Sequence, residues 1–340
     1  MDFILLFGGS SGERHVSVAS AQNVLSIAPA VSAWFIAPEG AVSEVTSGEV
    51  AAHERPFEVQ FVAKTPAFAP SMNEAVKKVG RRVVFIAMHG DEGENGTLQR
   101  LFEENGIAFT GSNADASKAC FDKVATKKIV SAKGVLVAAQ RLLDTHDTVA
   151  LTRTLSDFIG EHGKIVVKPM ASGSSVGLHI LDASSDLDTA ARAVTETGLG
   201  YMAEQFLTGR EITVGVADHG GNLSVIACSE VLVQDGRAFD YQGKYLGHGI
   251  KEVTPAELTP EQTKACEHVG LQAHRDLGCF GYSRSDTILT DKGPVFLETN
   301  TLPGLSKSSF VPQQLTSRGI KLADFIEGQL ALAAKRRDAR

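Results

Sequence analysis

Apolar residues gather along this chain in the short runs and alternations that are typical of strands. Residues 3–7 and 82–88 are almost continuously apolar, which predicts strands buried on both faces of a parallel sheet. Residues 281–290 and 295–300 instead alternate between apolar and polar side chains, which predicts strands with one buried face. We therefore expect an open α/β unit at the start of the chain and a β-hairpin near its end.

The hairpin predicts a cluster of charges. Its loop, residues 291–293, ends in glycine, which suits the left-handed third position of a three-residue loop. Asp286 then faces Glu298 and Arg284 faces Asn300, all on one side of the sheet. Facing carboxylates repel each other unless a cation lies between them. Carboxylate and amide oxygens suit Mg²⁺ shared with phosphates, and arginine can hold an anion or a developing oxyanion.

The alternative is a solvated hairpin face on which Arg284 bridges the two acids. The residues that follow, 301–309, form a small, hydroxyl-rich turn, and such a turn suits substrate capture. Their position just past the proposed metal site favours the functional interpretation.

A glycine-containing loop follows each of the first two strands. Residues 8–13 precede a helix that begins near Val16, and residues 89–96 follow the second strand. Because ligands bind beyond the carboxyl ends of parallel strands, both loops are expected at one crevice. Glu13 and His89 are the candidate ligand-binding residues. The alternatives are a helix-start acid for Glu13 and a backbone-bonded loop histidine for His89.

The middle of the chain offers candidates for a nucleotide site. Residues 165–168 read as a strand that ends in Lys168, and the small residues of 169–177 can turn backbone N–H groups toward phosphate. The ending of a P-loop is absent. A helix at residues 117–132 carries further lysines, which on a helix are usually solvated: Lys123, Lys127 and Lys128.

Residues 201–215 contain what a purine nucleoside needs. Glu204 and Glu211 bracket the apolar pair Phe206 and Leu207. An apolar slot with a polar edge suits the base, and a carboxylate suits the ribose diol. The alternative is an ordinary connector between two strands.

The last third of the chain contains a long loop and two helices. Residues 234–252 are glycine-rich and aromatic, which is typical of a lid or binding loop. A capping box with proline at the first helical position opens a helix at Thr259, and Gly278 ends it. A final helix is expected at 322–336, and the basic run 335–337 predicts a solvated helix end.

Composition narrows the class of protein. The chain has 340 residues, enough for two or three domains, and its net charge of -7 makes a nucleic-acid partner unexpected. No apolar run is long enough to span a bilayer, and the run at 3–7 lacks a basic leader. The four cysteines are scattered, which supports neither zinc nor disulfides and indicates reduced thiols in the cytoplasm.

In combination, nine stretches in chain order resemble the D-alanine–D-alanine ligases of the ATP-grasp superfamily. They are GGSSGERHVS, MHGDEGENGTLQ, FTGS, FDKVATK, VVKPMASGSSVG, EQFLTGREITVGV, FDYQGKYL, GYSRSD and ETNTLPG with the following Ser309-Phe310. The resemblance implies an α/β and α+β, three-domain ATP-grasp fold. Its units are an N-terminal open parallel-sheet unit (1–112), a central subdomain (113–207) and a C-terminal subdomain (208–340) with the metal site and a lid at about 234–252.

The resemblance also implies roles for individual residues. Phosphates would be held by Lys123, Lys168 and Lys244 under a loop with Ser174 and Ser175. Adenine would contact Glu204 and the backbone of Phe206 and Leu207, and the ribose would contact Glu211. Two Mg²⁺ ions, with Mn²⁺ as a substitute, would be bound by Asp286, Glu298 and Asn300. The amino acids and the developing oxyanion would contact Glu13, Ser174, Tyr245, His89, Arg284, the Gly304 N–H, Ser309 and Phe310.

The implied activity is ATP-dependent ligation of two D-alanines through an acyl phosphate, for peptidoglycan precursors. The resemblance further implies small amino acids as substrates, a homodimer and a cytoplasmic location. Departures from the usual residues of the family, namely His15, Asn95, Ser172 and Phe310, leave open a ligase with a different acceptor amino acid. A nicotinamide-dependent oxidoreductase, suggested by the first glycine turn, and a non-catalytic ATP-grasp module are further alternatives.

Overall fold

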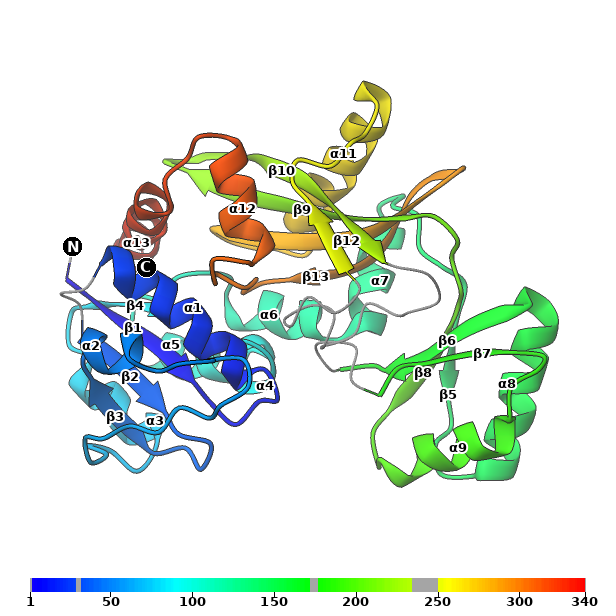
Figure 1. Cartoon of the computed structure of the whole chain (residues 1–340), viewed down its shortest axis with the longest axis horizontal. Coiled ribbons are helices and arrows are strands. Elements are labelled where there is room, and N and C mark those ends of the chain that lie inside the picture. The colour runs from blue at the N-terminus through cyan, green and yellow to red at the C-terminus, as the bar shows by residue number, and fades with distance from the viewer. Residues whose placement is uncertain (1, 29–31, 172–176, 234–249, 340) are drawn as a thin grey trace.

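The described part of the chain forms three separate sheets with helices packed around them. The computed structural model describes residues 2–28, 32–171, 177–233 and 250–339 (Figure 1). The first sheet uses residues 3–86, the second 140–205 and the third 210–300. The predicted α/β and α+β fold class is confirmed, and each sheet lies within one of the three predicted units.

The first unit is an open sheet with the order β3-β2-β1-β4. Its elements in chain order are β1 (Phe3–Gly8), α1 (Arg14–Ile27), β2 (Ser32–Ile36), β3 (Val42–Val45), α2 (Ser47–Ala51), α3 (Met72–Ala75), the 3₁₀ helix η1 (Val76–Lys78), β4 (Val83–Ile86), α4 (Asp91–Glu94) and α5 (Thr97–Glu104). β1 is buried along its whole length and pairs in parallel with β2 and β4, as its apolar run predicts. β3 adds an antiparallel edge, so the sheet is parallel only at its centre.

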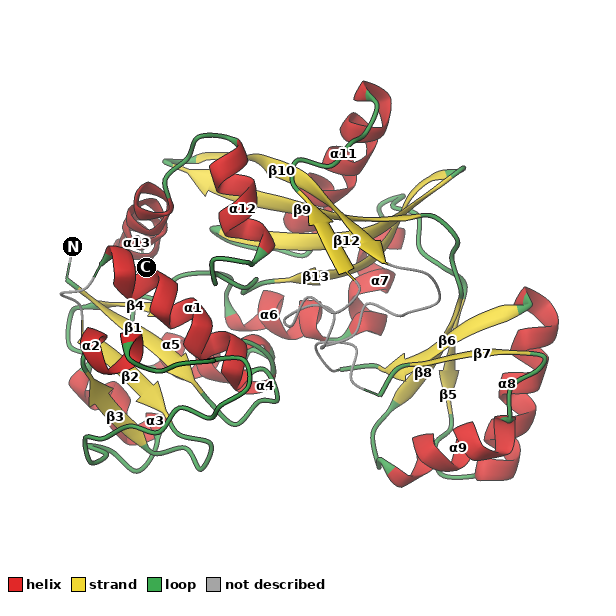
Figure 2. Ribbon diagram, in the orientation of Figure 1, coloured by secondary structure: helices red, strands yellow, loops and turns green. Residues whose placement is uncertain are grey.

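The second unit is an antiparallel sheet with the order β5-β8-β6-β7. Its elements are β5 (Gln140–Leu143), α8 (Thr148–His162), β6 (Lys164–Pro169), β7 (His179–Asp182), α9 (Leu187–Glu196) and β8 (Tyr201–Gln205). Helices α8 and α9 cover one face, where Leu155 and Phe158 pack with Ile165, Val167 and Tyr201 (Figure 2). Every second residue of β6 therefore points away from this core.

The third unit is an antiparallel sheet with the order β11-β10-β9-β12-β13. Its elements are β9 (Arg210–His219), β10 (Asn222–Val233), β11 (Ile250–Val253), α11 (Pro260–Asp276), β12 (Tyr282–Thr290), β13 (Gly293–Asn300), α12 (Phe310–Ser317) and α13 (Leu322–Asp338). Helix α11 opens with the predicted capping box at Thr259. It lies so close to β9 that a Cβ atom at Gly270 would be 2.5 Å from Cγ1 of Val214. α12 covers the other face, where Gly215 lies against Gln314.

The predicted helix at 117–132 consists of two helices, α6 (Ala114–Phe121) and α7 (Lys123–Ser131). The break occurs at Asp122, whose carboxylate accepts hydrogen bonds from the N–H groups of Val124 and Ala125 and caps α7. Although these helices belong to the predicted central unit, they pack against the third sheet. Their apolar side chains share a cluster with α11 and β13, which includes Cys120, Val130, Val269, Ala273 and Phe296.

The hairpin of β12 and β13 has a shorter turn than predicted. Thr290 pairs with Gly293, so two residues rather than three separate the paired positions. Gly293 adopts the expected left-handed backbone, with φ of 108°. Between the pairs Thr287–Phe296 and Asp286–Glu298 a bulge accommodates one extra residue on β13. The bulge offsets the shorter turn and restores the predicted partners of Asp286 and Arg284.

The C-terminal helix α13 returns to the first unit, where Phe325, Leu330 and Ala333 join the core of its sheet. Arg336 donates hydrogen bonds to the carbonyl oxygens of Phe109 (2.6 Å) and Gly111 (2.9 Å). The prediction of a solvated basic end is therefore wrong for Arg336. No described helix has both the length and the apolar character that a membrane span requires.

Candidate active site

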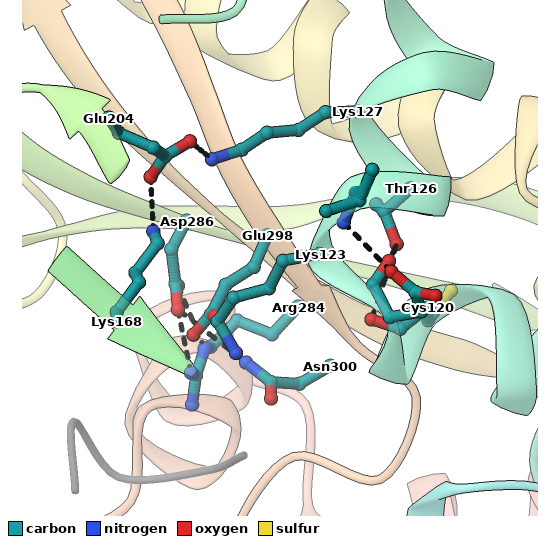
Figure 3. A network of polar contacts seen from close by, with 12 residues as sticks. Cys120, Lys123, Thr126, Lys127, Lys168, Glu204, Arg284, Asp286, Glu298 and Asn300 are labelled. Carbon is teal, nitrogen blue, oxygen red and sulfur yellow. Dashed lines mark hydrogen bonds and ion pairs between the residues drawn. The ribbon is translucent and has the colours of Figure 1, made fainter. Parts of the chain in front are cut away.

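The hairpin residues gather on the face of the third sheet that carries α12. Arg284 donates to both carboxylate oxygens of Asp286, from Nε at 3.0 Å and from Nη2 at 2.8 Å. Nδ2 of Asn300 lies 3.5 Å from the same carboxylate (Figure 3). Thr213 of β9, directly opposite Asp286, donates to its Oδ1 at 2.7 Å. The predicted clustering of these side chains is confirmed, and Thr213 is an additional member.

Lys123 connects this cluster to the second sheet. Its Nζ lies 3.2 Å from Oε2 of Glu298, and its backbone N–H donates to the carbonyl oxygen of Met170, just after β6. Both side chains are largely buried, Lys123 at 11% and Glu298 at 27% exposure. The start of α7 therefore places a lysine between the hairpin acids and the loop that follows Lys168.

A second charged group lies beside the first. Glu204 of β8 forms ion pairs with Lys168 of β6 and Lys127 of α7, one through each carboxylate oxygen (Figure 3). Glu204 is 3% exposed and Lys127 is fully buried. Burial, together with the neighbouring charge of Lys168, lowers the pKa of Lys127 well below its ordinary value. The expectation that lysines on this helix are solvated is therefore wrong for Lys127.

The predicted purine strip occupies the connection from β8 to β9. Phe206 and Leu207 are half-buried, and Nζ of Lys164 lies 4.5 Å from the centroid of the Phe206 ring. The N–H of Phe206 donates to the carbonyl oxygen of Lys164 at 2.9 Å, so this donor is already used within the protein. Glu211 is the second residue of strand β9 and lies opposite Ile288 of β12. Because the Phe206 N–H is engaged, only the carbonyl group of the Phe206 backbone is available to form a hydrogen bond with a purine base.

Acidic residues from the two glycine-containing loops meet at the edge of the first sheet. A Cβ atom at Gly90 would lie 2.9 Å from Oε2 of Glu13, so the two loops touch. Burial and the nearby Glu13 carboxylate raise the pKa of Glu94 well above its ordinary value, while Arg284 opposes this shift. A cationic group such as an ammonium, bound beside Glu13 and Glu94, would stabilise the ionised form of both carboxyl groups. The prediction named Glu13 but did not include Glu94.

His89 joins the first unit to the loop after β13. It is 4% exposed, and its Nδ1–H donates to the carbonyl oxygen of Leu302 at 2.8 Å. Its Nε2 lies 2.8 Å from the hydroxyl of Ser20, which also accepts from the N–H of Leu305. Burial lowers the pKa of His89, which favours the neutral ring that this pairing needs. Since both ring nitrogens are engaged, the backbone-bonded alternative describes the His89 geometry, and His89 positions residues 302–305.

That loop brings the predicted acceptor residues together. A Cβ atom at Gly304 would lie 2.6 Å from Oγ of Ser309, so the hydroxyl lies directly against the Gly304 backbone. Ser309 precedes α12, and its hydroxyl is 2.8 Å from that of Ser306. Phe310 is 7% exposed, and its ring centroid is 5.7 Å from Cζ of Arg284. Arg284 thus lies between Asp286 and the start of α12.

Several predicted residues cannot be placed. Ser174, Ser175, Lys244 and Tyr245 lie outside the described residues, as do Ser172 and most of the predicted lid at 234–252. The last residues of that range belong to β11.

The missed residues left weak signals in the sequence. Lys127 follows Lys123 by four positions, a spacing that places both on one face of a helix. Thr213 lies in an alternating strand, where its side is fixed only after the strand order is known. Glu94 lies in the loop that contains His89, but the choice among its three acids depends on the turn of α4.

Comparison with known proteins identifies similar chains over almost the full length. Residues 2–112 match the family described as D-ala D-ala ligase N-terminus, and residues 130–331 match D-ala D-ala ligase C-terminus. A D-alanine–D-alanine ligase of Leptospira interrogans is 30% identical, and one of Desulforudis audaxviator is 32% identical, each covering 98% of both chains. The crystal structure of the VanG D-Ala:D-Ser ligase from Enterococcus faecalis has a TM-score of 0.82 and 27% identity, and covers 98% of this chain and 99% of its own.

Proposed function

This chain belongs to the D-alanine–D-alanine ligase family, and we propose that it joins two D-alanine molecules with ATP, through an acyl phosphate. The product would be a dipeptide for peptidoglycan precursors. The observation that carries the proposal is the pair of charged groups in Figure 3, in which Lys123, Lys168 and the hairpin acids lie near one another where the second and third units meet. Neither group would be needed for a nicotinamide-dependent oxidoreductase.

ATP would bind between these two sheets. Lys123 and Lys168 would hold its phosphates, with Lys244 and the loop containing Ser174 and Ser175. Glu204, the Phe206 carbonyl and the Leu207 backbone would contact adenine, and Glu211 would accept hydrogen bonds from the ribose. In the structure Lys123 and Lys168 are each paired with a carboxylate, so phosphate would replace one anion with another.

Asp286, Glu298 and Asn300 fit a magnesium site by their chemistry, because all three offer oxygen donors on one side of the hairpin. No group of three or more His, Cys, Asp or Glu side chains within the described ranges is arranged to hold a metal ion. The set proposed here contains only two side chains of these types, Asp286 and Glu298, because its third member is the amide of Asn300. Two bound Mg²⁺ ions, or Mn²⁺ in their place, would neutralise charge on the transferring phosphoryl group.

The first D-alanine would bind where the first unit meets the third. Glu13 would hold its ammonium with Ser174 and Tyr245, and His89 would fix the wall formed by residues 302–305. The substrate carboxylate would attack the γ-phosphorus, and ADP would leave. Arg284 and the Gly304 N–H would stabilise the oxyanion when the second substrate attacks the acyl carbon.

The second D-alanine would bind at the start of α12. Ser309 would hold its carboxylate, and the Phe310 ring would line the pocket for its methyl group. After the ammonium loses a proton, the amine nitrogen bonds to the acyl carbon and phosphate leaves with one oxygen of the first substrate. A lid must exclude water, since water would otherwise hydrolyse the acyl phosphate.

An isotope experiment tests this chemistry. D-Alanine labelled with ¹⁸O in both carboxylate oxygens would be incubated with the protein, ATP and Mg²⁺, and phosphate and dipeptide would be analysed by mass spectrometry. We expect D-alanyl-D-alanine and one ¹⁸O atom in each phosphate, with no dipeptide from L-alanine. ADP without dipeptide, or phosphate without label, would contradict the proposal.

A second candidate is a ligase of the same chemistry with another acceptor amino acid. The buried Phe310 ring and the contacts among Ser306, Ser308 and Ser309 favour it, since a bulky ring and several hydroxyl groups lie together at the proposed acceptor site. A panel of D- and L-amino acids, with phosphate release as the readout, separates the two candidates. If D-alanine is the best acceptor, the second candidate fails.

We also propose a homodimer formed largely by the first unit, and a cytoplasmic location. Sedimentation equilibrium of the purified protein and fractionation of cells that express it would test these two statements.

A further inference from the structure

Lys127 is the one lysine that is fully buried among the described residues, and its ammonium group forms an ion pair with Glu204. The neighbouring Lys128 is exposed on the same helix. Taking an ammonium out of water is costly unless a carboxylate compensates. A position of this kind therefore needs an explanation beyond helix packing.

The two lysines on Glu204 differ in what they can reach. Lys168, at the end of β6, retains 13% exposure and is adjacent to the loop after that strand. Lys127 projects from α7, which packs on the third sheet, and has no exposed surface. When phosphate attracts Lys168 away from Glu204, Lys127 can remain.

We infer that Lys127 is a positioning residue for the nucleobase: it holds one oxygen of Glu204 so that the other can accept a hydrogen bond from the 6-amino group of adenine. This inference rests on the proposed adenine role of Glu204. Binding of ATP then includes an exchange, in which Lys168 turns from Glu204 to a phosphate and the amino group takes its place. Lys127 keeps Glu204 oriented throughout.

The arrangement also explains why two separate units contribute to the contact. Glu204 and Lys168 belong to the second sheet, whereas Lys127 belongs to a helix on the third. The Lys127–Glu204 ion pair therefore fixes the base-recognising carboxylate relative to the hairpin that carries the phosphate chemistry. A base that engages Glu204 is placed at a defined distance from Asp286.

Equilibrium binding of two nucleotides tests the inference. The probes are ATP and purine riboside triphosphate, which lacks only the 6-amino group, each measured with Mg²⁺ by calorimetry and without amino acids. The wild type should prefer ATP by about tenfold to a hundredfold, the range for a hydrogen bond to a charged group. In Lys127→Met the preference for ATP should be about tenfold smaller than in the wild type. In the matched control Lys128→Met the preference should equal that of the wild type.

A purely structural role for Lys127 would weaken both nucleotides equally, so an unchanged preference in Lys127→Met overturns the inference. If that variant does not fold, Lys127→Gln retains a donor in the same space and should show a preference below that of the wild type. A preference equal to that of the wild type would again overturn the inference. The binding assay needs no dipeptide, so loss of ligation would refute only the proposed function. Equal binding of both probes by the wild type would refute the Glu204 role.

Discussion

His274 should make folding of the third unit depend on pH. Its side chain is 2% exposed on α11, and Nδ1 lies 2.7 Å from the hydroxyl of Ser283, a residue of the strand that carries Arg284 and Asp286. Burial lowers the pKa of His274 from 6.5 to about 4, the Arg275 charge adds to this effect, and Asp218 opposes it. The folded protein therefore keeps the ring neutral at pH values where the unfolded chain protonates it.

The direction in which stability changes with pH follows from proton linkage. The unfolded chain binds the extra proton as the pH falls below 6.5, so the contribution to stability is complete above that pH and is lost as the pH approaches 4. The full difference corresponds to roughly 3 kcal/mol, of which about 2 kcal/mol disappears between pH 7 and pH 5.

Urea unfolding of the wild type and of His274→Gln, followed by circular dichroism from pH 7 to pH 5, measures this contribution. Glutamine can still bond to Ser283 but does not titrate, and the other histidines are common to both proteins. The free energy of unfolding should fall by about 2 kcal/mol more in the wild type than in the variant. Parallel pH profiles for the two proteins would refute the reasoning.

Two further changes test the packing around the site. Gly270→Ala should lower the free energy of unfolding by about 1–3 kcal/mol, because its Cβ would collide with Val214. The control Gly328→Ala, with no atom near its Cβ, should leave that free energy unchanged or raise it by about 0.5–1 kcal/mol. Equal effects of the two substitutions in urea unfolding would contradict this packing. Arg336→Met should lower the free energy of unfolding by about 2–4 kcal/mol, since two buried carbonyl groups lose their donor. The control Lys335→Met, at the exposed neighbouring position, should change the urea midpoint little. An Arg336→Met protein as stable as that control would show that these hydrogen bonds contribute nothing to stability.

The sequence predicted the strands well where burial alone determines the pattern. The apolar run at 3–7 is buried at every position, and the alternation of 281–290 places Arg284 and Asp286 on one face. The hairpin partners were predicted correctly although the turn was not. A bulge adds one residue where the turn removes one, and a local pattern does not reveal a bulge.

Other errors have a common physical cause, which is contact between distant segments. Lys127 and Arg336 have the side chains of a solvated helix face, yet each meets acceptors from a part of the chain that sequence spacing does not reveal. The break at Asp122 was missed because an aspartate inside a helical pattern is also common on an exposed face. Its role as a cap becomes visible only when the α6–α7 junction packs on the third sheet.

The most direct test of the account is the magnesium dependence of dipeptide formation in the wild type, Asp286→Asn and Asp291→Asn. Asp291 lies in the turn of the same hairpin and is exposed, so it is a matched control. We predict that Asp286→Asn loses at least about a hundredfold in kcat at every Mg²⁺ concentration, while Asp291→Asn follows the wild type. An Asp286→Asn protein with the rate and the magnesium dependence of the wild type would contradict the central claim that the hairpin acids hold the metal.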